Sequence, residues 1–420
     1  MIGHYLWLAV TAGAVSLFTP CVFPMIPITV SYFTHRAGVR SAMVFAAAII
    51  GSFTALGLLL ALIFGAAGVQ RFAANPFVNV VLAGLFVAFA LNLFGAYQIT
   101  VPSRALTALD SAARNQESSG AHIAGAVLMG LTFALTSFTC TAPFVGTVLV
   151  TAATGEWREP AIGMLAYSTV FALPFLVLAL IPQWAARLPQ AGRWLVSVKA
   201  VMGFLELAAA LKFLSNADLV WHWGIFTRDV VLALWVALAG LTAAYLVGSG
   251  PGTIARLAGA AAAIGVGTWL STGLVGRSLG DLESFLPPKP NAHDSYVVNL
   301  NWHVNNLPAA VALAKASSKP VFIDFTGYTC TNCRWMEANV FARADVRAEL
   351  NRFALARLFT DGDGPVFENQ QAYQEKTFKT VALPLYAVLA PDGHTIATLP
   401  GLTRDPTVFL AFLEKSATAQ

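Results

Sequence analysis

Four cysteines are the side chains of this sequence best suited to chemistry, and they occur in two settings. Cys330 and Cys333 form a C-x-x-C in a segment of mixed polarity, whereas Cys21 and Cys140 each lie within a long apolar stretch. Two thiols within reach of each other can form and break a disulfide, with the thiolate as the attacking species. Four cysteines are too few for a secreted domain held together by disulfides, so we interpret them as two redox pairs.

The C-x-x-C follows a segment with the pattern of a buried strand. Residues 319–326 read K-P-V-F-I-D-F-T, and a turn then leads into a helix that begins near Cys330. A helix N-terminus lowers the pKa of a thiol, so Cys330 is the expected nucleophile. Cys333 lies one turn further on, where it could resolve a mixed disulfide. A zinc site would need a second pair of ligands, and because the sequence offers neither a second C-x-x-C nor a histidine cluster, we expect no metal.

The two apolar cysteines have similar surroundings. Each has a proline three positions later, Pro24 after Cys21 and Pro143 after Cys140. The separation of 119 residues between these cysteines also relates two further pairs of identical residues, Gly84 with Gly203 and Phe94 with Phe213. We interpret this as an internal repeat of three spans, which must be inverted because the number of spans is odd. The repeat predicts that the two cysteines face each other near the middle of the bilayer.

Prolines are expected to break the helices near both cysteines. Pro20, Pro24 and Pro27 surround Cys21, and Pro143 follows the second cysteine. Broken helices at matching positions of a repeat indicate a functional site, because their unpaired backbone groups need a protein or water partner. Such free N–H groups could stabilise a sulfur anion. The alternative is that each cysteine is only a small buried apolar residue, which is the usual fate of a lone cysteine.

The composition indicates that most of the chain lies in a bilayer. Of the 420 residues, 57% are hydrophobic and 11% are charged, whereas about a quarter are charged in an ordinary soluble domain. A span needs about 20 apolar residues, and about eight runs approach that length: 6–33, 42–64, 77–98, 122–153, 160–181, 197–215, 229–247 and 254–275.

The expected fold is therefore a polytopic α-helical membrane domain followed by an α/β domain. We place the membrane domain at 1–280, a Pro-rich linker at 281–295 and the α/β domain at 296–420. The small net charge of +4 and the lack of a basic run argue against nucleic-acid binding.

Charged residues indicate the orientation in the membrane. Lys and Arg are more frequent in the loops after odd-numbered spans, which places these loops in the cytoplasm. With an even number of spans, both termini and the C-terminal domain then lie outside the cytoplasm, which in a bacterium is the periplasm. The first run lacks a positively charged start and a cleavage site, so we expect it to be retained as a span.

Glu206, in the sixth run, is a further candidate, because intramembrane carboxylates are often functional. A structural hydrogen bond or protonation in place would explain it equally well.

The C-terminal segment resembles the thioredoxin fold. After the strand and the C-x-x-C it has another strand that begins at Pro384, a P-D-G hairpin turn and a closing helix. The resemblance implies that Asp324 is the buried aspartate that accepts the proton of Cys333. It also implies that Pro384 is a cis-proline opposite the cysteines, where it helps to dock the substrate chain. Thr329 stands where thioredoxins usually have tryptophan.

Over nearly its whole length the chain resembles the DsbD family of thiol:disulfide interchange proteins. The resemblance lies in residues 18–27, 140–143 and 322–337, and within the last of these Glu337 matches an acidic residue four positions after the second cysteine. The family usually carries an N-terminal immunoglobulin-like domain with its own cysteine pair, whereas this sequence begins at the first span. The terminal acceptor is then a separate protein, or the upstream domain is missing.

The resemblance implies an electron relay across a bacterial inner membrane that uses cysteine pairs and no other cofactor. Cytoplasmic thioredoxin would reduce the Cys21–Cys140 pair, which would reduce Cys330–Cys333. The latter pair would reduce periplasmic disulfide-containing proteins. The chain would thereby also have a role in cytochrome c maturation. Two alternatives remain. One is an inverted-repeat exporter with an accessory thioredoxin-like domain. The other is a periplasmic disulfide oxidase, because the direction of electron flow depends on potentials that the sequence does not give.

Overall fold

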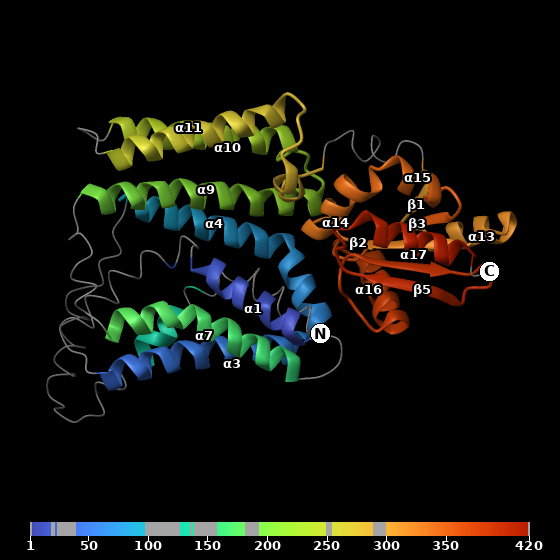
Figure 1. Cartoon of the computed structure of the whole chain (residues 1–420), viewed down its shortest axis with the longest axis horizontal. Helices are drawn as coiled ribbons and strands as arrows, with labels where there is room; N and C mark the ends of the chain where they lie inside the picture. Colours follow the sequence, from blue (N-terminus) through green and yellow to red (C-terminus); the bar gives the residue numbers. More distant parts are fainter. Residues whose placement is uncertain are drawn as a thin grey trace. The chain divides into compact units, whose positions relative to one another are not determined.

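The computed structural model describes residues 2–17, 22, 39–96, 127–134, 137, 158–180, 193–248, 254–288 and 300–418 (Figure 1). Its contacts divide the chain into two units, each described by itself below. The first unit comprises Met1–Val69 and Leu85–Leu207. The second comprises Gln70–Gly84 and Ala208–Gln420.

Long apolar helices make up most of the chain before residue 280. They are α1 (Ile2–Ser16), α3 (Val39–Ala74), α4 (Pro76–Leu93), α7 (Arg158–Leu180), α9 (Arg193–Trp221), α10 (Arg228–Gly248) and α11 (Ile254–Leu274). Within the described residues, four stretches are long and apolar enough to cross a membrane: Arg40–Leu59, Pro76–Leu93, Arg228–Gly248 and Ile254–Leu274. These four match predicted spans. Much of the first and fourth predicted runs lies outside the described residues, so the total of eight stays a prediction.

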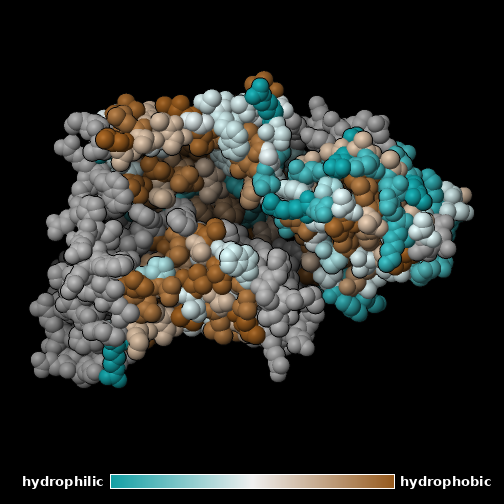
Figure 2. Space-filling model, in the orientation of Figure 1, coloured by the Kyte–Doolittle hydropathy of each residue, from teal (hydrophilic) through white to brown (hydrophobic). Residues whose placement is uncertain are grey.

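The exteriors of these helices are apolar, as lipid contact requires. Figure 2 shows hydrophobic surface over α7 and α11, and the large side chains exposed there include Leu165, Leu173 and Ile264. Soluble monomers rarely expose large apolar patches to water. The described helices therefore have the surface of a membrane domain.

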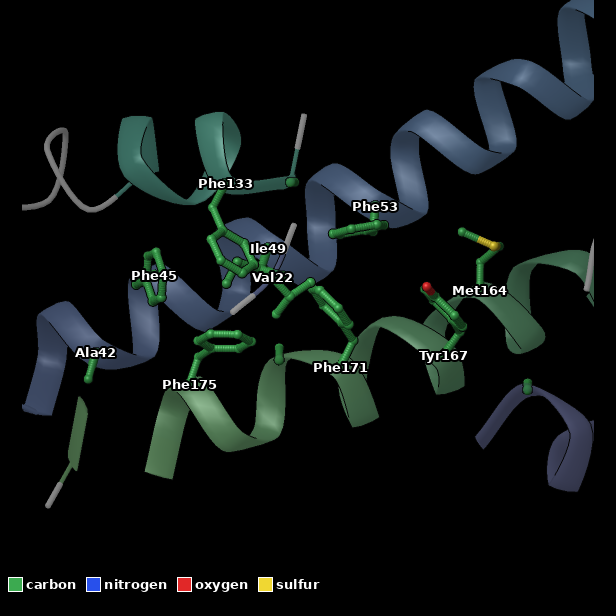
Figure 3. Packing of buried hydrophobic residues seen from close by; sticks show 13 residues of the cluster. Val22, Ala42, Phe45, Ile49, Phe53, Phe133, Met164, Tyr167, Phe171 and Phe175 are labelled. Atoms are coloured by element: carbon green, nitrogen blue, oxygen red, sulfur yellow. The ribbon is translucent and has the colours of Figure 1, made fainter. Parts of the chain in front are cut away.

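The first unit has a core of aromatic rings between α3, α7 and residues 127–134 (Figure 3). Phe133 lies edge-on to Phe175 with ring centroids 4.7 Å apart, and Phe53 packs against Phe171 at 5.0 Å. Aromatic pairs of this kind stabilise a structure beyond the gain from burying their apolar area. Because lipid is as apolar as the side chains, such packing is a main source of helix association in a membrane.

Helices α1 and α7 approach each other closely in the same unit. A Cβ atom on Gly13 would lie 2.7 Å from the carbonyl oxygen of Tyr167, so only glycine fits there. The Tyr167 hydroxyl donates a hydrogen bond of 2.8 Å to Ser16 Oγ, which in turn donates to the carbonyl of Ala12. Small residues at a helix contact and a buried polar bridge are both typical of membrane helix pairs.

In the second unit, a buried arginine joins α10 to the end of α11. Arg228 is 2% exposed, and its Nε donates a 2.7 Å bond to Glu283 while Nη1 donates to the carbonyl of Gly273. Glu283 belongs to η1, a 3-10 helix at Gly280–Phe285 that follows the last apolar helix. The start of the segment predicted as a linker is thus ordered by an ion pair.

The C-terminal part of the second unit is a five-stranded mixed sheet with helices on both faces. Its strands are β1 (Trp302–Val304), β2 (Val321–Thr326), β3 (Ala354–Phe359), β4 (Leu385–Leu389) and β5 (Thr395–Pro400), in the order β1-β3-β2-β4-β5. Strands β1, β2 and β3 are parallel, and β4 is antiparallel to both of its neighbours. The helical elements are α13 (Leu307–Ser317), α14 (Thr331–Met336), the π-helix η2 (Glu337–Phe341), α15 (Ala344–Leu350), α16 (Pro365–Phe378) and α17 (Pro406–Thr418).

Alternation along the central strand β2 builds two hydrophobic layers. Phe322 faces the core formed with α14, η2, α15 and α17, where it meets Met336 and Phe409. Ile323 and Phe325 face the opposite core, against α13 and α16. Because side chains alternate along a strand, Asp324 is on the same face as Phe322, beneath α14. This register brings an ionisable group under the cysteine-bearing helix.

Candidate active site

The C-x-x-C lies where the central strand ends and α14 begins. Cys330 is the N-cap of α14, and its Sγ accepts a hydrogen bond of 3.1 Å from the backbone N–H of Cys333. The two cysteines form a disulfide. Cys330 is partly exposed, whereas Cys333 is 2% exposed. The first cysteine is thus accessible to a partner, and the second is shielded.

The loop before Cys330 is held by a buried carboxylate. Asp361 Oδ1 accepts from the N–H of Tyr328 at 2.7 Å, and Oδ2 accepts from both the N–H and the hydroxyl of Thr329 at 2.9 Å. Gly327 is required beside it, since a Cβ there would lie 2.6 Å from Asp361 Oδ2. Burial raises the pKa of Asp361, while the bonds from this loop oppose the shift. Thr329, in the place usual for tryptophan, is therefore an anchor of the active-site loop.

Pro384 directly precedes β4, an interior strand that pairs with β2. The Leu383–Pro384 peptide bond is cis, as expected. Phe325 of β2 pairs with Leu385 of β4, so Pro384 comes directly before the paired residue at the end of β2 that leads to the cysteines. Its carbonyl accepts a 2.8 Å bond from the N–H of Gly401. The predicted docking role of Pro384 stays a prediction.

Asp324 is 2% exposed, and its carboxylate has a charged partner. Oδ2 accepts a 2.9 Å bond from Nε of Arg357, which is itself 3% exposed. Burial raises the pKa of Asp324 to about 6, and Arg357 opposes that shift. A carboxylate with such a pKa can accept and release a proton near neutral pH. Asp324 was predicted to accept the proton of Cys333, and that role stays a prediction. The structure shows in addition that Arg357 is the ion-pair partner of Asp324.

Glu337 begins η2 and lies between two buried arginines. Its Oε2 is 2.9 Å from Nη1 of Arg334, and its Oε1 is 3.6 Å from Nη1 of Arg357. Arg334 also donates to the carbonyl of Gly327, at the start of the active-site loop. π-Helical turns are often found at functional sites.

Sequence reasoning did not single out Arg334, Arg357 or Asp361. A signal was present for Arg357, since an arginine inside the apolar run 354–359 must find a counter-ion when buried. Its partner could not be named, because the partner depends on how strands far apart in the sequence pair.

The predicted membrane site lies outside the described residues. This holds for Cys21 and Cys140 and for all the prolines proposed to break the helices around them: Pro20, Pro24, Pro27 and Pro143. Glu206, in α9, is 1% exposed, and its Oε2 has no hydrogen-bond partner within the described part of the chain. The described residues also hold no group of three or more His, Cys, Asp or Glu arranged to bind a metal.

The fold and the cysteine pair together define a class: a helical membrane domain joined to a thioredoxin-like domain whose C-x-x-C forms a disulfide. Comparison with known families agrees for both parts. The profile of the cytochrome C biogenesis protein transmembrane domain matches residues 3–217, and a thioredoxin-like profile matches residues 301–391. The chain belongs to the cytochrome C biogenesis protein transmembrane domain family. It is also similar in sequence to DsbD-type thiol:disulfide interchange proteins.

Several relatives of the chain are named thiol:disulfide interchange proteins. The chain is 29% identical over 375 residues to thiol:disulfide interchange protein DsbD 2 of Pseudomonas aeruginosa, covering 84% of this chain and 60% of the relative. It is 31% identical over 361 residues to DsbD of Vibrio cholerae, covering 83% of this chain and 57% of that protein. DsbD of Yersinia pestis is 28% identical over 428 residues, covering 98% of this chain and 67% of that protein. The chain thus spans about 60% of the length of the first of these relatives.

Proposed function

We propose that the chain is a transmembrane thiol–disulfide reductase that delivers electrons to disulfide-containing proteins outside the cytoplasm. The observation that carries the proposal is the Cys330–Cys333 disulfide at the start of α14, in a thioredoxin-like domain that follows a membrane domain. Fold alone would not define an activity. The accessible first sulfur, the buried second sulfur and the adjacent carboxylate supply the parts that disulfide exchange needs.

The reduced domain would act in two steps. The Cys330 thiolate attacks the disulfide of a client, forming a mixed disulfide and releasing one client sulfur as a thiolate. The backbone N–H that donates to Cys330 Sγ favours the anionic sulfur before attack. Cys333 then loses its proton to Asp324 and attacks the Cys330 sulfur. The client leaves with both thiols reduced, and Cys330–Cys333 carries the disulfide.

Electrons must then return to Cys330–Cys333 from the other side of the bilayer. We propose Cys21 and Cys140 as the pair that supplies them and cytoplasmic thioredoxin as the donor that reduces this pair. Pro20, Pro24, Pro27 and Pro143 would break the helices to admit the partner sulfurs. These roles rest on the sequence repeat and on the resemblance to the DsbD family.

The orientation in the membrane and the clients are part of the same proposal. The Lys and Arg distribution favours an inner-membrane protein with its C-terminal domain in the periplasm. Its clients would be periplasmic thiol–disulfide proteins, including components of cytochrome c maturation. Pro384 would help to dock the client chain beside the reactive sulfur.

Trapping the mixed disulfide tests this proposal. Replacing the resolving thiol, Cys333→Ser, should accumulate chain joined through Cys330 to a client or to a membrane cysteine. The matched variant Cys330→Ser should trap nothing, because the attacking sulfur is gone. The measurement is non-reducing gel mobility of the full chain in cells after acid quench and alkylation. Equal trapping by the two variants, or none with Cys333→Ser, would contradict the proposed chemistry.

A further inference from the structure

Four charged side chains, three of them buried and the fourth, Glu337, 17% exposed, form a continuous line beneath the active site. They alternate in sign in the order Asp324, Arg357, Glu337 and Arg334, with nitrogen–oxygen distances of 2.9, 3.6 and 2.9 Å. The line therefore has no net charge. Buried charges are costly unless they are paired, so such a set is kept only where each member has its partner.

The sheet register explains why Arg357 is the partner of Asp324. The two residues sit opposite each other on the parallel strands β2 and β3. Leu355, two residues before Arg357, packs into the core that includes Phe322, so the arginine points to the same face as Asp324. The guanidinium carbon also lies 4.4 Å from the centre of the Trp302 ring, within the range of a cation–π contact.

The resolving cysteine lies over this face. Met336, on α14, packs into the same core as Phe322. Cys333 precedes it by one helical turn and is also buried, so it is on the inward side of α14. The sulfur that must lose a proton and the Asp324–Arg357 pair are thus on the same side of the sheet.

We propose that Arg357 is a positioning residue for the exchange reaction, which keeps the Asp324 carboxylate anionic and oriented so that it can take the proton of Cys333. The proposal rests on the proposed function and adds to it. In the resolving step Asp324 gains the proton of Cys333, the new sulfur–sulfur bond forms at Cys330, and the leaving thiolate carries away the electron pair. Arg357 takes no part in bond making and acts only through the carboxylate.

Other groups around Asp324 act on it unequally. Burial and the Glu337 carboxylate raise its pKa, while Arg357 and the more distant Arg334 lower it. Tyr386, opposite Asp324 on β4, is buried and has its own pKa raised well above the usual value, so it stays neutral. Arg357 makes the direct ion pair, and its removal would therefore leave the carboxylate protonated over a wider pH range.

The resolving step can be observed with a small aromatic disulfide. Purified full chain carrying Cys21→Ala and Cys140→Ala is reduced and mixed with dithiodipyridine. Attack by Cys330 releases one thiopyridone, and resolution by Cys333 releases a second, so the rate of the second release isolates the step in question. In the parent this rate should rise with pH through about 6, the pKa of Asp324.

Arg357→Gln should move the midpoint of that pH profile upward by about one unit or more, the size of effect expected for losing an arginine next to an aspartate. Arg357→Lys keeps a positive charge and should recover most of the shift. Arg352→Gln is the matched control, because that arginine is exposed and pairs with Glu349, away from the Asp324 ion pair. Its profile should equal that of the parent.

A double-mutant comparison separates positioning from folding. With Asp324→Asn already present, Arg357→Lys should leave the pH profile unchanged, because the group through which it acts is absent. This arm stands even if Arg357→Gln does not fold. An unshifted midpoint in Arg357→Gln, a loss by one factor at every pH, or a shift of the profile by Arg357→Lys when Asp324 is already replaced by asparagine would overturn the inference. A second release that persists in Cys333→Ser would instead overturn the proposed function.

Discussion

Thr329 directly precedes the first reactive sulfur, and its two bonds to Asp361 fix the backbone there. A carboxylate can accept all three hydrogen bonds that this loop donates. An amide of the same shape can accept only with its oxygen, and its NH2 group would face an N–H donor. The loop conformation therefore depends on the charge of Asp361 and not only on its size.

Asp361→Asn should make the loop before Cys330 more mobile while leaving both cysteines in place. Hydrogen bonds to a charged group contribute about 1.5–3 kcal/mol each, so we expect the amides of Tyr328 and Thr329 to exchange at least about tenfold faster. Thr329→Val, which removes only the hydroxyl bond, should have a smaller effect in the same direction. The measurement is hydrogen exchange of the full chain by mass spectrometry. Unchanged protection in Asp361→Asn would show that the loop is held by other contacts.

At the residue scale, the sequence was sufficient where chemistry depends on local spacing. Cys330 and Cys333 were predicted from the C-x-x-C alone, and the cis-proline at Pro384 followed from a family resemblance. Arg357 and Asp361 were missed because their partners lie about 33 positions away and are brought together only by the pairing of β2 with β3.

Among the elements, α1 and α7 depend on one glycine for their close contact. Alanine normally stabilises a helix relative to glycine. At Gly13, however, the added carbon would meet the carbonyl oxygen of Tyr167, a backbone atom that cannot turn aside. At this position the close packing of two membrane helices favours glycine more strongly than helix propensity favours alanine.

Gly13→Ala should therefore destabilise the first unit by about 1–3 kcal/mol, as overpacking commonly does. Gly51→Ala in α3 is the matched control, because its added carbon would meet nothing within 4 Å. The measurement is the thermal stability of the purified full chain in detergent. We expect a lower Tm for the first variant and an unchanged or higher Tm for the second. Equal values would mean that α1 and α7 do not pack as closely as described.

Element positions were easier to predict than element ends. Apolar run length placed α4, α10 and α11 correctly, because each begins and ends near a change in polarity. Helix α9 was predicted to end at 215 but continues to Trp221. Its last turns contain polar residues such as Asp218, which accepts bonds from the backbone N–H groups of Ile225 and Phe226. Side-chain hydrogen bonds to the segment that follows thus hold the end of a helix that composition predicted to stop earlier.

At the scale of the whole molecule, composition and order of elements were enough to predict a helical membrane domain followed by a thioredoxin-like domain. A charged content of 11% over the whole chain, with long apolar runs before residue 280, leaves few other environments for that part. The strand–C-x-x-C–helix order with a later proline-led strand is specific to few folds. The inverted repeat stays a prediction, because the residues that would meet across it lie outside the described part of the chain.

The central claim is that electrons reach Cys330–Cys333 from the cytoplasm through the membrane cysteines. The most direct measurement is the redox state of Cys330–Cys333 in living cells, trapped by acid and alkylation, with and without cytoplasmic thioredoxin. We predict that the pair is largely reduced when thioredoxin is present and oxidised when it is absent. Cys21→Ser should give the oxidised state even with thioredoxin present. A pair that stays reduced without thioredoxin, or in Cys21→Ser, would contradict the account.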